Sequence, residues 1–270
     1  MTMGVLTATA TSLGTGTTKT LLNGGAAVTM PSWAKELVAI VPYATLTTVT
    51  AAQALLVKIE LESTDCHIQP HESSPTPQQG CIGTTHDVHS ATPDIFEVHC
   101  PLQGGEEINV YGTALQSNTV APYAGVSIVV SSVRTGRQVF RKCGTMTATS
   151  TTVGEVVGTA FTINGSEQII EVCGSTCKKG TMTASQPTIG YVRLYSSDFK
   201  VAVPVKFIVT PLPAGLGTIG TPSIGGLARF PVRIPTNSTC RITDYFTNGF
   251  ALTAAGQWLS QVAFHQTGRN

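Results

Sequence analysis

The sequence contains two windows, residues 96–111 and 230–245, that share one pattern at an offset of 134 residues without gaps. Each window has the pattern of a strand, a turn marked by proline and a second strand. The residues of the first window that recur in the second are Phe96, Val98, Pro101, Ile108 and Tyr111. Three shorter blocks recur in the same order at offsets of 132 to 135, namely 37–40 with 169–172, 57–59 with 192–194 and 63–65 with 196–198. Strands in a chain with few charges resemble one another, but four blocks in one order predict an internal duplication.

Short apolar runs bounded by Gly, Pro, Asn or Ser recur along the whole chain. We predict strands at 37–41, 55–61, 94–100, 106–111, 124–133, 155–163, 168–173, 189–195, 199–209, 229–234, 241–246 and 257–264. One short helix is expected near Ser32–Leu37, with Ser32 as its N-cap. The 41 Thr, 27 Gly and 15 Pro, together with a charged fraction of 11%, are unlike the composition of a helical bundle. The fold class is therefore predicted to be all-β, built as a sandwich or barrel.

The duplication divides the chain into two tandem β-sandwiches, residues 1–138 and 139–270, joined near 131–144. The predicted connecting segment gathers four basic residues, Arg134, Arg137, Arg141 and Lys142. Such a segment could contact nucleic acid or anionic lipid head groups. We favour a solvated connector, or one that pairs with the carboxylates of a neighbouring subunit. Each half also contains a long loop at the same relative place, 66–93 and 210–228, and twin long loops predict paired protrusions on one side of the molecule.

Metal-ligating residue types concentrate in one part of the first half. They are Cys66, His67, His71, Cys81, His86, His89, His99 and Cys100. Zinc requires four such groups in a tetrahedron, but the spacing matches no tight ligand pattern and the second half, with only His265, does not repeat it. We predict no metal site and no cofactor. The seven cysteines are an odd number spread along the chain, which favours free thiols, although Cys173 and Cys177 have the spacing of a local disulfide or half a metal site.

Two carboxylates, Glu60 and Glu62, fit the requirement of glycoside hydrolysis for a pair of acids, because strand geometry separates them by about 7 Å. A solvated strand face explains them equally well, and we prefer that interpretation. The chain has no GxSxG, GxxxxGK[ST] or HExxH motif. The larger aromatic residues are interpreted as core or interface anchors, namely Trp33, Tyr111, Tyr123, Tyr245 and Trp258. We therefore predict no catalytic residues and no enzymatic activity.

The overall charge and hydropathy restrict the partners. A net charge of +1 and a pI near 7.6 argue against a basic nucleic-acid-binding domain. Low charge in a folded chain predicts a surface largely covered by protein partners. The uncharged stretch 37–57 is long enough to cross a bilayer, but its β-branched clusters favour two buried strands around a polar turn. No signal peptide is expected from the first residues.

With its repeated FxVxxPx6IxxY blocks at 96–111 and 230–245, the chain resembles the double jelly-roll major capsid proteins of tailless icosahedral viruses, and is similar in size to those of membrane-containing bacteriophages. The resemblance covers the whole chain and is architectural. It implies two tandem eight-stranded jelly-roll sandwiches that stand upright on the shell. It also implies homotrimers of pseudo-hexagonal outline, lateral contacts between trimers, other virion proteins as partners and an internal lipid membrane beneath the shell.

The expected function is that of a structural virion protein, a major capsid protein assembled in the host cytoplasm, with no sequence-specific binding of nucleic acid. The alternative is a two-domain jelly-roll protein that binds glycans or acts on them as an enzyme. A cell-surface adhesin or a minor virion component such as a spike is a third possibility. The enzyme alternative predicts a groove with convergent carboxylates or an exposed aromatic row.

Overall fold

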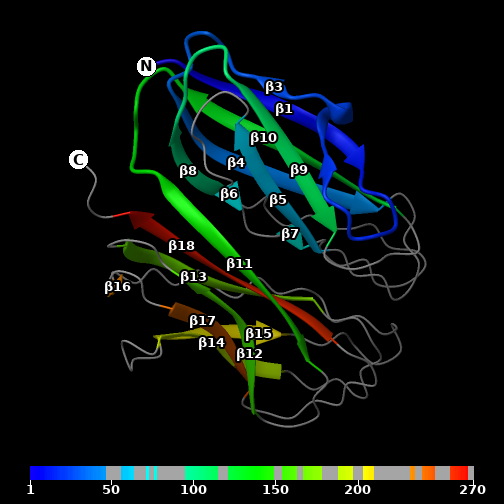
Figure 1. Ribbon diagram of the computed structural model, residues 1–270, viewed down its shortest axis with the longest axis vertical. Coiled ribbons are helices and arrows are strands. Elements are labelled where there is room, and N and C mark those ends of the chain that lie inside the picture. The colour runs from blue at the N-terminus through cyan, green and yellow to red at the C-terminus, as the bar shows by residue number, and fades with distance from the viewer. Residues whose placement is uncertain are drawn as a thin grey trace. The chain divides into compact units, whose positions relative to one another are not determined.

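The computed structural model describes residues 1–46, 56–63, 71–72, 76–77, 95–114, 121–148, 154–162, 167–177, 188–196, 203–209, 232–234, 239–246 and 256–266. The regular elements of these residues are antiparallel β-strands, apart from one 3-10 turn, η1 (Asn23–Gly25), so the all-β prediction is confirmed (Figure 1). None of the helical structure in these ranges is long and apolar enough to cross a membrane. The described residues divide into two compact units, and the division falls between Arg141 and Lys142, inside the strand β11 (Val139–Ala148), most of which belongs to the second unit.

The first unit contains two sheets. One sheet has the order β1 (Met3–Ser12), β10 (Pro122–Ser131), β4 (Glu36–Leu46) and β8 (Phe96–Pro101). The other has β9 (Glu107–Ala114) and β5 (Leu56–Ser63) at its centre. Two short strands, β2 (Thr20–Leu21) and β3 (Val28–Thr29), both pair with β9, and two more, β6 (His71–Glu72) and β7 (Thr76–Pro77), both pair with β5.

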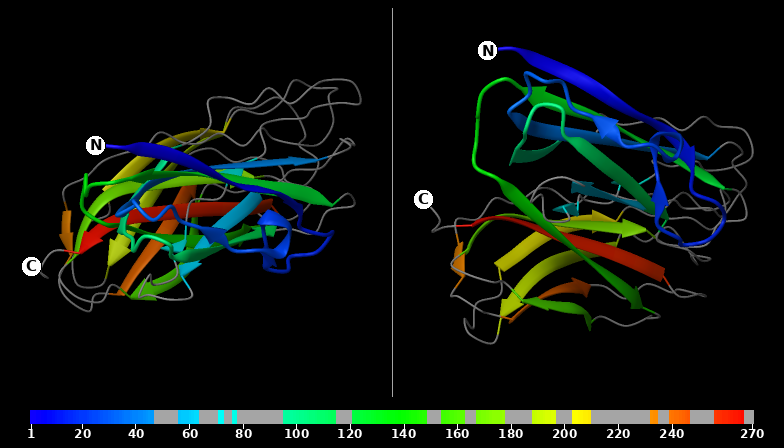
Figure 2. Two further views of the ribbon diagram at one scale, coloured as in Figure 1. Left: turned by 90° about the horizontal axis from the view of Figure 1, so that it is seen from above. Right: turned by 45° about the horizontal axis from the view of Figure 1, so that its top comes forward.

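The second unit also contains two sheets. One has the order β11 (Val139–Ala148), β18 (Gly256–Gln266), β13 (Glu167–Cys177) and β16 (Val232–Ile234). The other has the order β12 (Gly154–Thr162), β17 (Thr239–Phe246), β14 (Thr188–Ser196) and β15 (Val203–Val209). Figure 2 shows two further views of these sheets.

The two units have the same strand order. In the second unit the strands, numbered by their succession along the chain, form sheets of order 1-8-3-6 and 2-7-4-5. In the first unit β2 and β3 share one position, as do β6 and β7, and the orders are then again 1-8-3-6 and 2-7-4-5. In both units strand 1 therefore pairs with 8, 2 with 7, 3 with 6 and 4 with 5.

The repeated sequence blocks fall on strands of equal rank. The block at 37–40 lies in β4 and its counterpart in β13, and both are third in their unit. The register of these strands against β10 and β18 also agrees, because Val38 is left unpaired between two ladder positions of β4 and Ile170 between two of β13. Val38 and Ile170 are separated by 132 residues, which is the offset of this block in the sequence. Both units thus carry a β-bulge at the same place.

The core of the first unit lies between its two sheets. Alternation along β9 and β10 directs one face of each strand inward, so that Ile108, Val110, Val126 and Ile128 are all fully or nearly fully buried. Other large side chains of this core with less than 2% exposure include Leu22, Met30, Leu37, Ile40 and Ile59. The bulge at Val38 allows both Leu37 and Ile40 to reach the core, although they are three residues apart.

Two predictions about local structure are wrong. The expected helix near Ser32–Leu37 is absent, because residues 32 and 33 form a turn and Glu36 already begins β4. The β-branched run that follows Glu36 pairs with β10, and this ladder determines the conformation more strongly than the N-cap signal does. The predicted connector 131–144 is also too long, because residues 139–144 belong to β11. The prediction was misled by the basic residues Arg141 and Lys142, which made this part of β11 resemble a linker in composition.

Candidate functional site

The largest group of buried polar contacts in the described side chains surrounds Glu36, at the start of β4. Its neighbour Leu37 is in the core, so alternation along the strand places Glu36 on the opposite face of the sheet. The side chain of Glu36 is nevertheless 0% exposed. A buried carboxylate needs hydrogen-bond donors or positive charge around it, since its desolvation is otherwise costly. The segment that follows β10 supplies them.

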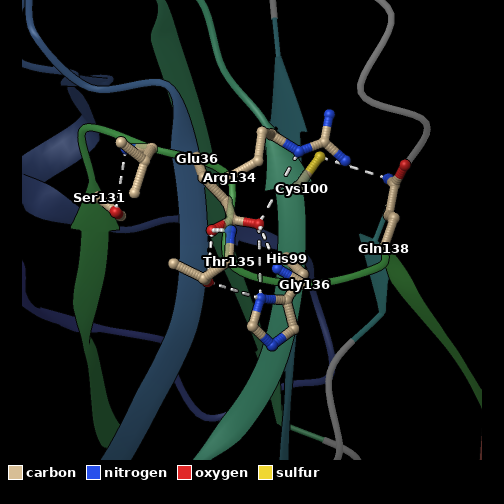
Figure 3. Close-up of polar contacts among 9 residues, drawn as sticks. Glu36, His99, Cys100, Ser131, Arg134, Thr135, Gly136 and Gln138 are labelled. Carbon is tan, nitrogen blue, oxygen red and sulfur yellow. Dashed lines mark hydrogen bonds and ion pairs between the residues drawn. The ribbon is translucent and has the colours of Figure 1, made fainter. Parts of the chain in front are cut away.

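Three donors of this segment converge on the Glu36 carboxylate (Figure 3). The backbone N–H of Thr135 donates to Oε2 at 2.7 Å, and the Thr135 hydroxyl donates to the same oxygen at 2.6 Å. The backbone N–H of Gly136 donates to Oε1 at 3.3 Å. Hydrogen bonds to an ionised acceptor are among the strongest in proteins. Glu36 thereby fixes the backbone at two consecutive residues that lie 99 and 100 positions away in the sequence.

Two further groups with nitrogen donors lie beside the carboxylate. The Nε atom of Arg134, whose side chain is half exposed, is 3.9 Å from Oε1, and Nδ1 of His99 is 3.5 Å from the same oxygen. His99 has a positive φ of 49° in β8. A Cβ atom at Gly136 would lie 2.6 Å from the His99 ring, so this close approach of backbone to ring requires glycine.

This arrangement differs from a catalytic triad. In a relay from hydroxyl to carboxylate, the two groups contact opposite nitrogens of the histidine ring. Here the Thr135 hydroxyl lies 3.2 Å from Nδ1 of His99, and the Glu36 carboxylate approaches the same nitrogen (Figure 3). The hydroxyl also donates directly to Glu36. The geometry suits a clamp on the backbone of residues 134–136, rather than activation of a nucleophile.

Cys100 lies next to this clamp and has a free, buried thiol. Burial, with a further contribution from the negative charge of Glu106, raises the pKa of the Cys100 thiol to about 12. The Nε2 amide of Gln138 donates to its Sγ at 3.3 Å. Because the thiolate is the form that attacks substrates and binds metals, a thiol with this pKa is poorly suited to either role near neutral pH.

A second buried carboxylate, Glu106, holds a turn of the same unit. It accepts hydrogen bonds from the backbone N–H of Gln103, at 3.0 Å, and from the hydroxyl of Ser63. The backbone N–H of Glu106 in turn donates to the carbonyl of Gln103 at 3.1 Å. This turn lies directly before β9, so Glu106 ties the start of β9 to the end of β5.

The two acids considered for glycoside hydrolysis, Glu60 and Glu62, form ion pairs with lysines. Lys19 is hydrogen-bonded to the Glu62 carboxylate, lies 3.8 Å from Glu60 and stands over the ring of Tyr111 at 4.2 Å. Lys58 is 3.2 Å from Glu60. Partial burial lowers the pKa of Lys19, but the hydrogen bond to Glu62 and the charge of Glu60 outweigh it and raise the pKa overall. Lys19 belongs to no sequence motif. It lies in the irregular segment that precedes β2.

The other residues singled out from the sequence are placed as follows. Of the eight possible metal ligands, His99 and Cys100 have described side chains, and only the backbone of His71 is described, in β6. The remaining five, Cys66, His67, Cys81, His86 and His89, lie outside the described residues. Among the side chains that the structure describes, no three His, Cys, Asp or Glu residues are grouped so as to hold a metal ion.

The aromatic and basic residues are dispersed. Trp33 is partly exposed and would contact a Cβ atom at Gly4, whereas Tyr111 faces Lys19. Tyr245 and Trp258 occupy backbone positions of β17 and β18, and Arg141 and Lys142 of β11. The Glu36 clamp is missed by sequence reasoning. One signal for it is a charged residue immediately before a buried strand, but this residue alone does not identify its partners.

Comparison with known proteins does not assign the chain to a family. No protein-family model matches the chain, and no curated protein has a significant sequence match to it.

Proposed function

We propose that the chain is a structural protein, a major capsid protein built from two tandem eight-stranded jelly rolls, residues 1–138 and 139–270. The observation that carries the proposal is the shared strand order of the two units, 1-8-3-6 and 2-7-4-5. A jelly roll is a long antiparallel hairpin wrapped across two sheets, which pairs strand 1 with 8, 2 with 7, 3 with 6 and 4 with 5. Viral capsid proteins are one of the groups that use this fold.

The duplication supports the assembly that we propose. A chain with two like domains forms a tile of six similar units when three chains associate, and such a tile is close to hexagonal in outline. Tiles of this kind can make equivalent lateral contacts in a closed icosahedral shell. The location that follows is the virion, with assembly in the host cytoplasm and other virion proteins and an internal membrane as neighbours.

The composition is consistent with extensive contact between copies. A charged fraction of 11% means that few ions would lose their hydration at an interface, and burying an ion costs several kcal/mol. Small Thr and Ser side chains also lose little rotamer entropy when they are immobilised. We infer that lateral contact area, rather than ion pairing, would hold the shell together.

The alternative role, binding or cleavage of glycans, uses the same fold class, since lectins are also built on jelly rolls. It would place function at the patch of Glu60, Glu62 and Tyr111. The ion pairs of Lys19 to both carboxylates favour a structural role for these residues, because glycoside hydrolysis needs one acid that is protonated and one that is free.

The proposal is tested by the assembly state of the expressed full chain. Native mass spectrometry and gel filtration are expected to give three copies of the 28.2 kDa chain, or larger particles, and negative-stain electron microscopy should show hexagonal tiles or shells. A monomer at every concentration and salt level would overturn the capsid proposal. A monomer that also binds an immobilised glycan would favour the alternative. Dissociation of assembled particles between low and moderate salt would contradict the contact-area inference.

A further inference from the structure

The segment 132–138 connects β10, the last strand of the first unit, to β11, which pairs with β18 of the second unit. Several contacts hold this segment to the first unit. The backbone N–H of Ser132 donates to the carbonyl of Thr2 at 3.0 Å, and Glu36 accepts the backbone N–H groups of Thr135 and Gly136. Because these bonds fix the main chain rather than side chains, they determine the path along which the chain leaves the first unit.

We propose that the Glu36 clamp acts as a latch on the connection between the two units. This latch consists of the Glu36 carboxylate, the N–H groups of Thr135 and Gly136, and the Thr135 hydroxyl (Figure 3). While it is closed, residues 134–136 follow one path against β4 and β8. When the carboxylate is removed, three hydrogen bonds are lost together and residues 134–136 become free to move. This inference goes beyond the proposed function and holds whether or not the chain builds a shell.

The sequence also contains a repeat of the residues that donate to Glu36. The triplet Thr135-Gly136-Arg137 recurs as Thr267-Gly268-Arg269, at an offset of 132 residues. The same offset relates Glu36 in β4 to Gln168 in β13, and Glu36 and Gln168 both lie two positions before the bulge residue of their strand. The second copy of the triplet lies outside the described residues.

The two halves differ at the position of the acceptor. The triplet occurs in both halves, but only the first half has a carboxylate at the position of Glu36. A carboxylate accepts stronger hydrogen bonds than a carboxamide does. The stronger acceptor thus occurs in the half whose triplet precedes β11.

Trypsin provides a direct test, because the latch holds the peptide bond that trypsin would cut after Arg134. The side chains of Arg134 and Arg137 are exposed, but the N–H of the Arg134–Thr135 bond is bonded to Glu36. A protease must bind the segment in an extended form, and cleavage of a native protein therefore follows the population in which the segment is released. The full chain should be digested briefly under native conditions, with the ends of the fragments identified by mass spectrometry.

The variants E36A, E36Q and E106Q are compared with the parent chain. E36A is expected to increase cleavage after Arg134 by at least about tenfold, and E36Q by a smaller factor, since its amide retains one acceptor oxygen. E106Q is the matched control, because it alters another buried carboxylate of the same unit that does not contact the segment. It should leave cleavage after Arg134 unchanged.

Two results would overturn the latch. One is an unchanged cleavage rate after Arg134 in folded E36A. The other is an increase that is matched by equal increases after Lys19 and Lys35, which would show general loosening of the unit. If E36A does not fold, the conservative E36Q variant decides between the same outcomes.

Discussion

The carboxylate of Glu36 accepts a 2.7 Å hydrogen bond from the backbone N–H of Thr135, 99 residues further along the chain. The same carboxylate also accepts the Thr135 hydroxyl at 2.6 Å. A single side chain at the start of β4 therefore positions the exit of the first unit. The same contacts predict how substitutions at Thr135 change the free energy of unfolding.

T135A should lower the free energy of unfolding by about 1–2 kcal/mol, because it removes a hydroxyl that donates to the buried side chain of Glu36. T135S retains the hydroxyl and should lose less than half of that amount. Urea denaturation of the three proteins, followed by circular dichroism, measures the difference. Equal midpoints for T135A and T135S would show that the methyl group, and not the hydrogen bond, carries the effect.

The high pKa of Cys100 predicts how stability changes at alkaline pH. The folded thiol has a pKa of about 12 and the unfolded thiol about 9, so the folded state holds this proton more tightly. The stabilisation is complete below pH 9 and is lost as the pH rises from 9 towards 12. Above pH 9 the parent chain should lose up to about 1.4 kcal/mol per pH unit more than C100A does. Parallel curves from urea denaturation at pH 8 to 10.5 would contradict the prediction.

Gly104 lies in a position that no side chain can occupy. A Cβ atom there would lie 2.0 Å from the backbone carbonyl oxygen of Ser32, and this backbone cannot move without disturbing the turn before β4. G104A should therefore destabilise the protein by about 2–4 kcal/mol. G16A is the control, since its nearest neighbour, the Thr18 hydroxyl, is 4.0 Å away. It should change the unfolding free energy by less than about 0.5 kcal/mol. Similar melting temperatures for the two variants would rule out the close contact.

Lys19 should contribute little to stability, although it pairs with two carboxylates. Its side chain is 38% exposed, and ion pairs at such sites contribute about 0.2–1 kcal/mol. K19M should destabilise the protein within that range at low salt, and E62Q in the K19M background should recover part of the loss by removing one of two repelling acids. Both effects should shrink in 1 M salt, where charges are screened within about 3 Å. A loss that is independent of salt would show that the packing on Tyr111 dominates.

The sequence predicted best those strands whose side chains alternate against the core. The runs at 106–111 and 124–133 correspond to β9 and β10 because their apolar faces are visible in the sequence itself. β1 is different, because its Thr-Ala-Thr-Ala stretch has no apolar run and forms a strand by pairing with β10, more than 100 residues away. β11 likewise forms a strand by pairing with β18, despite its basic residues.

The candidate site was less predictable, because its residues are also brought together by pairing between strands that are distant in the sequence. His99 and Cys100 were recognised as residues capable of chemistry, and the structure brings both close to the segment after β10. Their partners Glu36, Thr135 and Gln138 belong to no motif. They meet only because β4, β8 and β10 share a sheet, which is a property of the topology and not of the local sequence.

The bulge at Val38 supports the last prediction, which tests whether the two units share a design at the level of single residues. Deleting Val38 would remove the bulge and leave Leu37 opposite Val130 and Ala39 opposite Val129, which are consecutive residues of β10. Leu37 and Ile40 would then keep the core face through regular alternation, and Glu36 would stay on the other face. The deletion should therefore fold, and V38A, which keeps the bulge, should cost less than about 1 kcal/mol, because Val38 is only partly buried. Ile170 occupies the same register position in β13, and its deletion would leave Ile169 opposite Phe264 and Glu171 opposite Ala263, so it should also be tolerated. Circular dichroism and thermal unfolding of the three variants provide the comparison. If the chain tolerates one deletion but not the other, the equal registers of the two units do not reflect equal structural demands.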